Sequence, residues 1–117
     1  MARLSEPFVL LDDARPGGRA RLYSEPTAIV ETRDFGAVRA CLERLRGEQA
    51  AGFLAYEAGL ALEDRLAPLG VPPAADAPPL LWFGLFGTVE EVDAAALLPD
   101  GAGAWAGAAR PLISRAE

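Results

Sequence analysis

The stretch Ala-Gly-Phe-Leu-Ala-Tyr-Glu-Ala-Gly-Leu, residues 51–60, is apolar from Gly52 to Tyr56 and continues with one carboxylate, Glu57. A short apolar run between glycines is typical of a strand whose two faces are both covered. The stretch therefore predicts a central strand over residues 52–57, with Glu57 emerging where that strand ends.

A second apolar run, Leu-Leu-Trp-Phe-Gly-Leu-Phe at residues 80–86, predicts another core strand, with residues 88–92 as its prolongation. Both faces of this strand need cover, because apolar side chains occupy every position except Gly84. One helix with a single apolar face can cover only one side of a small sheet. We therefore expect the other side to be partly bare.

Residues 34–46 carry the clearest helical pattern of the chain. Its large apolar residues recur at spacings of three and four and so share one face of a helix: Phe35, Val38, Leu42 and Leu45. Thr32 or Asp34 can cap the start, and Gly47 can end the helix. We expect the apolar stripe to dock this helix onto the sheet.

The remaining chain predicts short strands and turns. Three N-terminal strands follow one another closely, which favours antiparallel pairing because parallel pairs need long crossovers; they are expected at residues 8–11, 19–24 and 27–31. Five prolines make residues 67–79 a loop, and short helical turns are predicted at residues 60–66 and 93–98. The pattern predicts an α+β fold, mainly antiparallel sheet with one main packed helix.

The composition indicates one cytoplasmic domain. The chain has 117 residues, a formal charge of −6 and a single cysteine, Cys41, which suits a reducing compartment. The acidic balance argues against a nucleic-acid partner, since such binding depends on clustered basic residues. The N-terminus lacks the apolar core of a signal peptide, and no apolar run approaches the roughly 20 residues of a membrane span.

The residue types limit the chemistry of the chain. Neither histidine nor lysine is present, which excludes Schiff-base lysines, histidine-based triads and histidine-ligated metals. We therefore predict no catalytic residue, no metal site and no cofactor in this chain. Three carboxylates lie at the predicted strand ends: Asp12, Asp13 and Glu57. Paired carboxylates can do acid–base work or hold a hard cation, but here they either simply end strands in solvent or, if functional, meet the amine of a ligand rather than catalyse.

Four segments resemble the N-terminal region of component I of the chorismate-utilising enzymes, aminodeoxychorismate synthase and anthranilate synthase. Residues 8–13 (Phe-Val-Leu-Leu-Asp-Asp) resemble the opening strand and its Leu-Leu-x-Ser motif, and residues 52–59 are similar to the G-x-x-x-Y-E/D-x-G strand. Residues 79–86 look like the next core strand. Residues 111–117 resemble the segment that leads into the catalytic domain. The short turn after Asp13 is more similar to aminodeoxychorismate synthase.

The resemblance implies that residues 1–110 form a noncatalytic N-terminal domain and that residues 111–117 begin the approach to a missing chorismate-binding domain. The full enzyme would aminate chorismate to 4-amino-4-deoxychorismate for para-aminobenzoate and folate synthesis. Its implied partners are that downstream domain, which holds Mg²⁺, and a glutamine amidotransferase, component II, which supplies ammonia. An anthranilate synthase domain and a stand-alone small-molecule-sensing or interaction domain are the alternatives.

Some members of the family hold a regulatory tryptophan on the Leu-Leu-x-Ser segment and a following arginine-containing strand. By resemblance, the corresponding effector-binding residues here are Leu11, Asp13 and Arg19. Asp13 stands where the motif has serine, and the turn at residues 14–18 contains no aromatic residue. These departures set the tryptophan in doubt, while Asp13 remains a candidate partner for an ammonium group.

Overall fold

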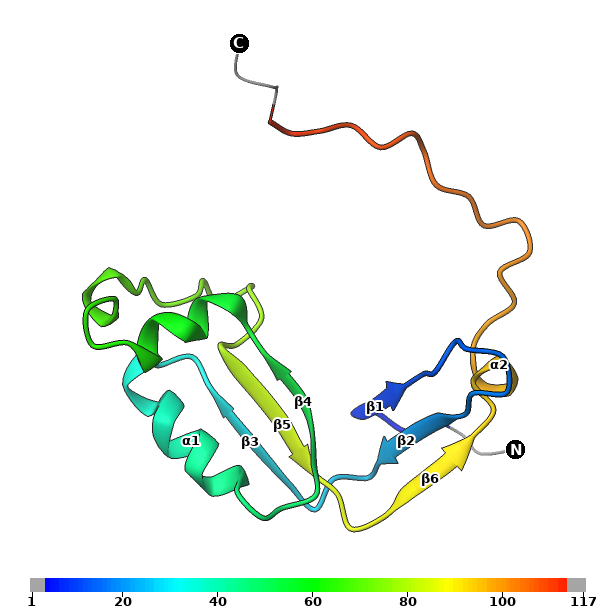
Figure 1. Cartoon of the computed structure of the whole chain (residues 1–117), viewed down its shortest axis with the longest axis horizontal. Helices are drawn as coiled ribbons and strands as arrows, with labels where there is room; N and C mark the ends of the chain where they lie inside the picture. Colours follow the sequence, from blue (N-terminus) through cyan, green and yellow to red (C-terminus); the bar gives the residue numbers. More distant parts are fainter. Residues whose placement is uncertain (1–3, 114–117) are drawn as a thin grey trace.

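The computed structural model describes residues 4–113, which form two three-stranded antiparallel sheets with a few short helices (Figure 1). Sheet A has the order β1-β2-β6, and its strands are β1 (Phe8–Leu11), β2 (Ala20–Ser24) and β6 (Val89–Val92). Sheet B has the order β3-β5-β4, and its strands are β3 (Ala28–Thr32), β5 (Leu81–Leu85) and β4 (Ala50–Leu54). The predicted α+β class is confirmed. Residues 114–117, part of the segment expected to lead into a further domain, lie outside the described residues.

The predicted helix is present as a 3₁₀ turn, η1 (Phe35–Ala37), followed by α1 (Val38–Leu45). Asp34 caps its start, because its carboxylate accepts a hydrogen bond from the Gly36 amide at 2.9 Å. Gly47 follows the helix with φ of +77°, a conformation that glycine adopts without strain. Of the apolar stripe, Val38 is fully buried, and Cys41 on its border is half-buried.

The expectation that residues 52–57 form the central strand is wrong. β4 ends at Leu54 and lies at an edge of sheet B, whereas β5 lies in the middle and pairs with both β3 and β4. Phe53 and Leu54 are accordingly 42% and 43% exposed. Beyond the strand the chain turns into a 3₁₀ helix, η2 (Tyr56–Leu62), so Glu57 lies in the first turn of η2 rather than at the strand's end.

One glycine fixes how closely β4 approaches the middle strand. A Cβ atom on Gly52 would overlap the carbonyl oxygen of Trp82 and would lie 2.7 Å from the Cα atom of Phe83. Only glycine leaves room for the backbone of β5 at this point. Gly52 therefore allows the edge strand β4 to lie close to β5, and does not mark a strand that is buried on both faces. Trp82 itself, expected in the core, is half-buried.

The single sheet expected from the sequence is divided in two. β1 and β2 pair as predicted, but β3 leaves them after Glu25, whose φ is +54°, and after Pro26, and it joins sheet B. Residues 89–92 do not prolong β5 but form β6 on the outer side of β2. Phe86 lies at the junction of the sheets, where its ring meets that of Tyr23 edge-on with centroids 5.5 Å apart.

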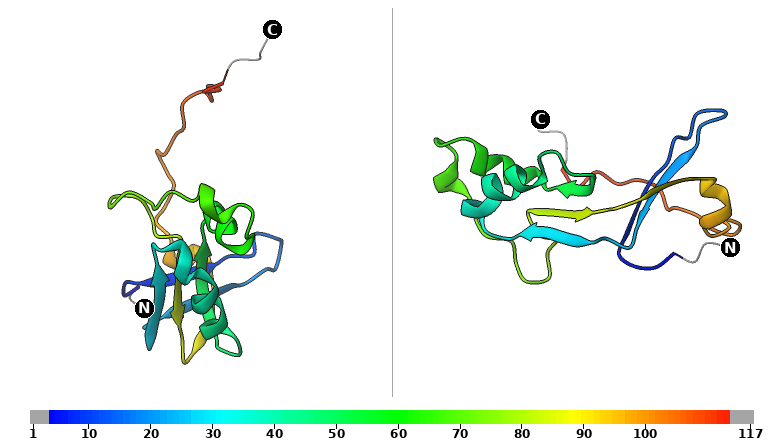
Figure 2. Two further views of the ribbon diagram at one scale, coloured as in Figure 1. Left: turned by 90° about the vertical axis from the view of Figure 1, so that its left-hand side faces the viewer. Right: turned by 90° about the horizontal axis from the view of Figure 1, so that it is seen from below.

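Helical cover is concentrated on sheet B. α1 contacts β3, β5 and η2 (Figures 1 and 2), and a small core joins α1, η2 and the start of β5 through Val38, Ala58 and Leu80. The predicted helical turn at 60–66 thus begins earlier, at Tyr56. The proline-rich loop contains a further 3₁₀ turn, η3 (Ala67–Leu69), which the proline density had not suggested. The last helix, α2 (Ala94–Leu97), begins after Asp93, whose carboxylate accepts a hydrogen bond from the Ala95 amide. It lies within residues 93–98, where the sequence predicts a short helix.

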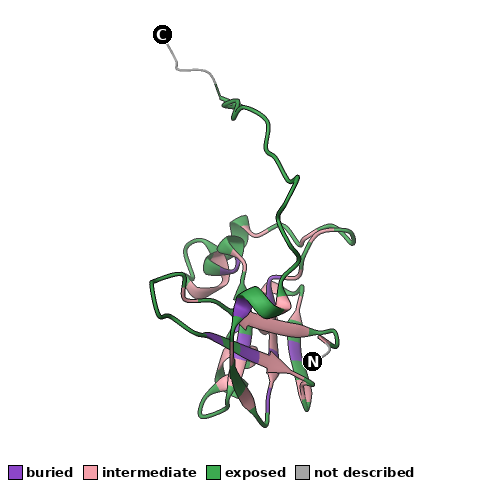
Figure 3. Ribbon diagram, turned by 90° about the vertical axis from the view of Figure 1, so that its right-hand side faces the viewer, coloured by how far each residue is buried: buried purple, intermediate pink, exposed green. Residues whose placement is uncertain are grey.

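Much apolar surface is left open, as the single helix led us to expect. Besides β4, Ile29 of β3 is 44% exposed. Residues 99–113 form an extended and fully exposed segment that carries Trp105 (Figure 3). The Cα radius of gyration is 18.1 Å, compared with about 13 Å for a compact chain of this length. No helix within residues 4–113 is long and apolar enough to cross a membrane.

Candidate functional site

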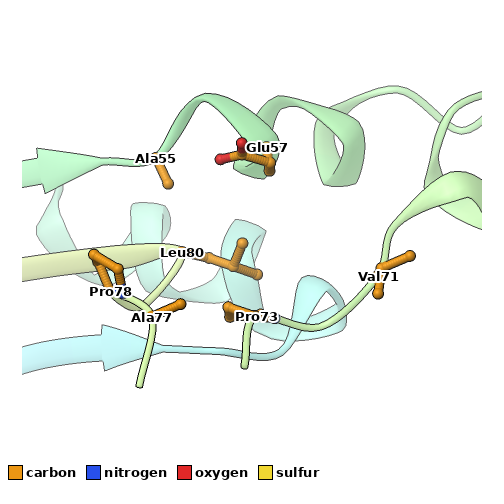
Figure 4. Close-up of a pocket in the computed structure, with 7 residues that line it drawn as sticks. All are labelled: Ala55, Glu57, Val71, Pro73, Ala77, Pro78 and Leu80. Atoms are coloured by element: carbon orange, nitrogen blue, oxygen red, sulfur yellow. The ribbon is translucent and has the colours of Figure 1, made fainter. Parts of the chain in front are cut away.

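The candidate site is a pocket between η2 and the proline-rich loop, with Glu57 at its upper wall (Figure 4). Its volume is about 350 Å³. Apart from Glu57, every lining residue is apolar: Ala55, Val71, Pro73, Ala77, Pro78 and Leu80. The pocket therefore combines one negative charge with a hydrocarbon surface.

Backbone hydrogen bonds at the end of sheet B hold the inner wall. The Ala55 amide donates to the carbonyl oxygen of Leu80 at 2.8 Å, and the Leu80 amide donates to that of Thr32 at 3.0 Å. These bonds continue the ladders of β4 and β3 one residue beyond β5. Leu80 is also 2% exposed and packs in the core with Val38, so the floor of the pocket is fixed from two sides.

The outer wall is a loop that long-range contacts tie to the domain. Arg33 donates from Nη1 to the carbonyl oxygen of Ala74 at 2.9 Å, and the Ala77 amide donates to the same oxygen at 2.9 Å. Farther back, Gly70 lies against the ring of Phe35, since a Cβ atom there would be 3.1 Å from ring carbons. The prolines restrict the remaining backbone freedom. The loop is therefore shaped before any ligand arrives.

Glu57 projects from the first turn of η2, where a negative charge is favourable near the N-terminal amides. Its side chain is exposed, and within residues 4–113 the ion pairs are formed by other residues. The same carboxylate also lines a second hollow of about 430 Å³, whose other residues are Tyr56, Gly59, Leu60 and Leu66. Of the carboxylates singled out in the sequence, Glu57 is the one that meets an apolar pocket.

Asp13, by contrast, is already bound by a neighbouring arginine. Arg15 donates to its two carboxylate oxygens from Nε at 2.8 and 3.1 Å and from Nη2 at 2.6 Å. The side-chain hydrogen bonds from Arg15, together with that from its backbone amide, lower the pKa of Asp13 below its ordinary value. A shallow hollow of about 260 Å³ lies at this turn, and Asp13, Arg15 and residues 16–18 line it.

The other two proposed effector residues, Leu11 and Arg19, have neighbours other than Asp13. Leu11 is 52% exposed at the end of β1, where it lies opposite Arg21 of β2. Arg19 pairs with Glu91 at the base of sheet A, with Nε 3.2 Å from the carboxylate oxygen. The turn therefore gathers Asp13 with Arg15, while the nearest ion-pair partner of Arg19 belongs to β6. An ammonium ligand at Asp13 would have to displace the guanidinium of Arg15.

Sequence reasoning identified Glu57 but not the pocket beside it. The sequence predicts only a loop at residues 67–79, and the lining residues Val71, Pro73 and Ala77 carry no recognisable motif. The predictive signal lay in the proline density, because prolines make a loop rigid enough to form a wall. Within residues 4–113 no cluster of three or more histidine, cysteine, aspartate or glutamate side chains is arranged to hold a metal ion.

Comparisons with known proteins give no relative to set beside this geometry. No protein-family model, no curated protein and no solved structure matches the chain.

Proposed function

We propose that this chain is the noncatalytic N-terminal domain of an aminodeoxychorismate synthase component I. In the whole enzyme it would pack beside a chorismate-binding domain that converts chorismate to 4-amino-4-deoxychorismate, with ammonia from a glutamine amidotransferase. The observation that carries the proposal is the order and spacing of four similar segments over nearly the whole chain, at residues 8–13, 52–59, 79–86 and 111–117.

The chain's own chemistry supports a packing role. It contains no imidazole and no side-chain amine, the groups that most often act as general bases or covalent nucleophiles near neutral pH. Its carboxylates are spread over the surface, and one of the best placed, Asp13, is bound to Arg15. A domain with this inventory contributes surface to an enzyme more readily than it contributes reacting groups.

An open apolar face of sheet B also supports the proposal. Residues directly opposite one another in an antiparallel pair share a face, and the register places Phe53 of β4 opposite Trp82 of β5. Ile29 of β3 falls on the same face, opposite Gly84, and Glu31 is the charged residue of β3 on this face, opposite Trp82. Ile29 and Phe53 remain 44% and 42% exposed. Apolar patches of this kind mark interaction surfaces when they are contiguous.

The proposal is tested by the product that the enzyme forms. We expect residues 1–117 alone to yield neither aminodeoxychorismate nor anthranilate from chorismate, Mg²⁺ and ammonia. The reading frame beyond codon 117 should encode a chorismate-binding domain, and the protein expressed from the longer frame should form aminodeoxychorismate. Anthranilate as its product would assign the domain to anthranilate synthase instead. Either product from residues 1–117, or a longer frame encoding an unrelated domain, contradicts the proposal.

The open face gives a second test on the isolated chain. We expect residues 1–117 to self-associate as concentration rises, because apolar surface on sheet B lacks cover. A lysine in place of Phe53 should reduce this association in sedimentation experiments. Leu69→Lys is the matched control, since Leu69 is 65% exposed on η3, away from the strands. A concentration-independent monomer would show that the face needs no partner.

A further inference from the structure

We propose that the pocket beside Glu57 binds a small organic ammonium ion with an apolar body, such as an arylalkylamine. The site consists of the carboxylate of Glu57 and the hydrocarbon wall formed by Ala55, Val71, Leu80 and the loop prolines (Figure 4). This inference is independent of the proposed function, because it rests on the pocket and not on the resemblance to a family.

The charged residue in the lining of the pocket favours a cation. Glu57 is the one charged residue of the lining, and residues 55–80, which include both walls, contain four acidic side chains and one arginine. Asp76 belongs to the loop wall, between the lining residues Pro73 and Ala77. The surrounding charge is mixed, because the guanidinium of Arg33 binds the loop wall at the carbonyl oxygen of Ala74 and that of Arg39 binds the end of η2 at Leu62. The preference for a cation therefore rests on the carboxylate of Glu57, which would repel an anionic ligand in the pocket.

The cation must be organic rather than a metal ion. Hard cations such as Ca²⁺ and Mg²⁺ need several oxygen ligands, and the described residues bring only the Glu57 carboxylate to this pocket. The other side chains of the lining are all hydrocarbon. An ammonium group satisfies one carboxylate and carries an apolar body into the space over Leu80.

The size and rigidity of the pocket suit a small ligand. Its volume of about 350 Å³ lies at the lower end of the range of about 300–1,000 Å³ found for small-molecule sites. The Arg33–Ala74 hydrogen bond and the prolines hold the loop in place, so little ordering entropy is lost on binding. The exposure of Glu57 keeps its charge contribution modest, because water competes for the carboxylate.

The decisive experiment compares three nearly isosteric probes by NMR titration of the amide groups in residues 1–117. 2-Phenylethylammonium should give saturable shifts at Ala55, Glu57, Ala77 and Leu80. 2-Phenylethanol should bind more weakly by a factor of up to about five, since an exposed ion pair adds up to about 1 kcal/mol. Phenylacetate should bind more weakly still. Equal shifts from all three probes, or no saturable shift from the ammonium, would overturn the proposal.

Two charge-removing variants separate the site from the general field of the protein. Glu57→Gln should abolish the advantage of the ammonium over the alcohol while keeping the apolar contacts. Glu63→Gln removes the same charge just beyond η2, outside the pocket lining, and should leave that advantage in place. Both positions are exposed, so both variants should fold. An equal loss in the two variants would reduce the effect to net charge and overturn the assignment.

Discussion

Sheet A and sheet B have the same number of strands and the same antiparallel pairing, yet they are stabilised differently. In sheet B, α1 packs against β3 and β5, η2 packs against α1, and Leu81 of the middle strand is fully buried. Sheet A buries Ala20 and Leu22 of its middle strand and carries its ion pairs on the surface. In both sheets the least exposed residue lies in the middle strand, although Val30 of β3 and Ala51 of β4 are also buried in the edge strands of sheet B. The position of a strand among its neighbours therefore matters for its contribution to stability beside its apolar content.

The largest effect should come from the middle of sheet B. Leu81→Ala should lower the free energy of unfolding by about 2–5 kcal/mol, because it removes a fully buried side chain and leaves a cavity. Denaturant unfolding measures this loss. Leu112→Ala, at a fully exposed position of the C-terminal segment, should change stability by less than about 0.5 kcal/mol. Similar values for the two variants would mean that β5 is not the core of sheet B.

A somewhat smaller effect should follow at the contact of β4 with the middle strand. Gly52→Ala should destabilise by about 1–3 kcal/mol, because the new Cβ overlaps the backbone of β5, which cannot move without breaking a ladder. Gly59→Ala is the matched control, since a Cβ there meets open space in η2 and alanine favours helical backbone. We expect it to leave stability unchanged or slightly raised. A neutral Gly52→Ala would show that β4 pairs less closely than described.

The outer residues of β4 should matter less. Leu54→Ala should lower the free energy of unfolding by about 1 kcal/mol, because Leu54 is 43% exposed at an edge and loses only part of the burial energy of a leucine. Read from the sequence as a central strand, the same substitution would be expected to lower it by about 2–5 kcal/mol. Denaturant unfolding of Leu54→Ala and Leu81→Ala in parallel distinguishes an edge position of β4 from a central one. An equal loss of unfolding free energy in the two variants would mean that β4 belongs to the core.

The limits of sequence-based prediction follow from these strands. Local signals identify some elements: helical spacing and Asp34 predict α1, and the turn at residues 14–18 joins β1 to β2, where Gly17 has a φ of +75°. The order of strands within a sheet depends on long-range pairing, which an apolar run does not encode. A glycine such as Gly52 is compatible with a central strand and with an edge strand that approaches its neighbour closely, so the residue type alone does not distinguish the two.

Predicting the site was limited for the same reason. The sequence places Glu57 at the end of an apolar run, but its pocket forms only where residues 71–78 fold back over Leu80. That return is held by Arg33 and Ala74, which are 41 residues apart in sequence. The contact at Asp13 is local instead, because the arginine that binds its carboxylate, Arg15, is only two residues away in sequence. The family resemblance names Arg19 as an effector-binding residue beside Asp13, whereas the structure pairs Arg19 with Glu91.

The smallest effect on stability is expected at the turn between β1 and β2, where the experiment tests which arginine binds the carboxylate of Asp13. Hydrogen bonds from Arg15 lower the pKa of Asp13 in the folded state, so this group favours folding above the ordinary aspartate pKa, and the benefit is lost as pH falls through the lowered value. Arg15→Ala should return the pKa of Asp13, followed by NMR of its carboxyl carbon, toward the ordinary value. Stability at neutral pH should not change measurably, because the pair is solvent-exposed.

Arg19→Ala is the control and should leave the pKa of Asp13 unchanged, since Arg19 pairs with Glu91. If Arg19→Ala raised it as much as Arg15→Ala, the two arginines would share Asp13, and the effector arrangement of Leu11, Asp13 and Arg19 would gain its first physical support.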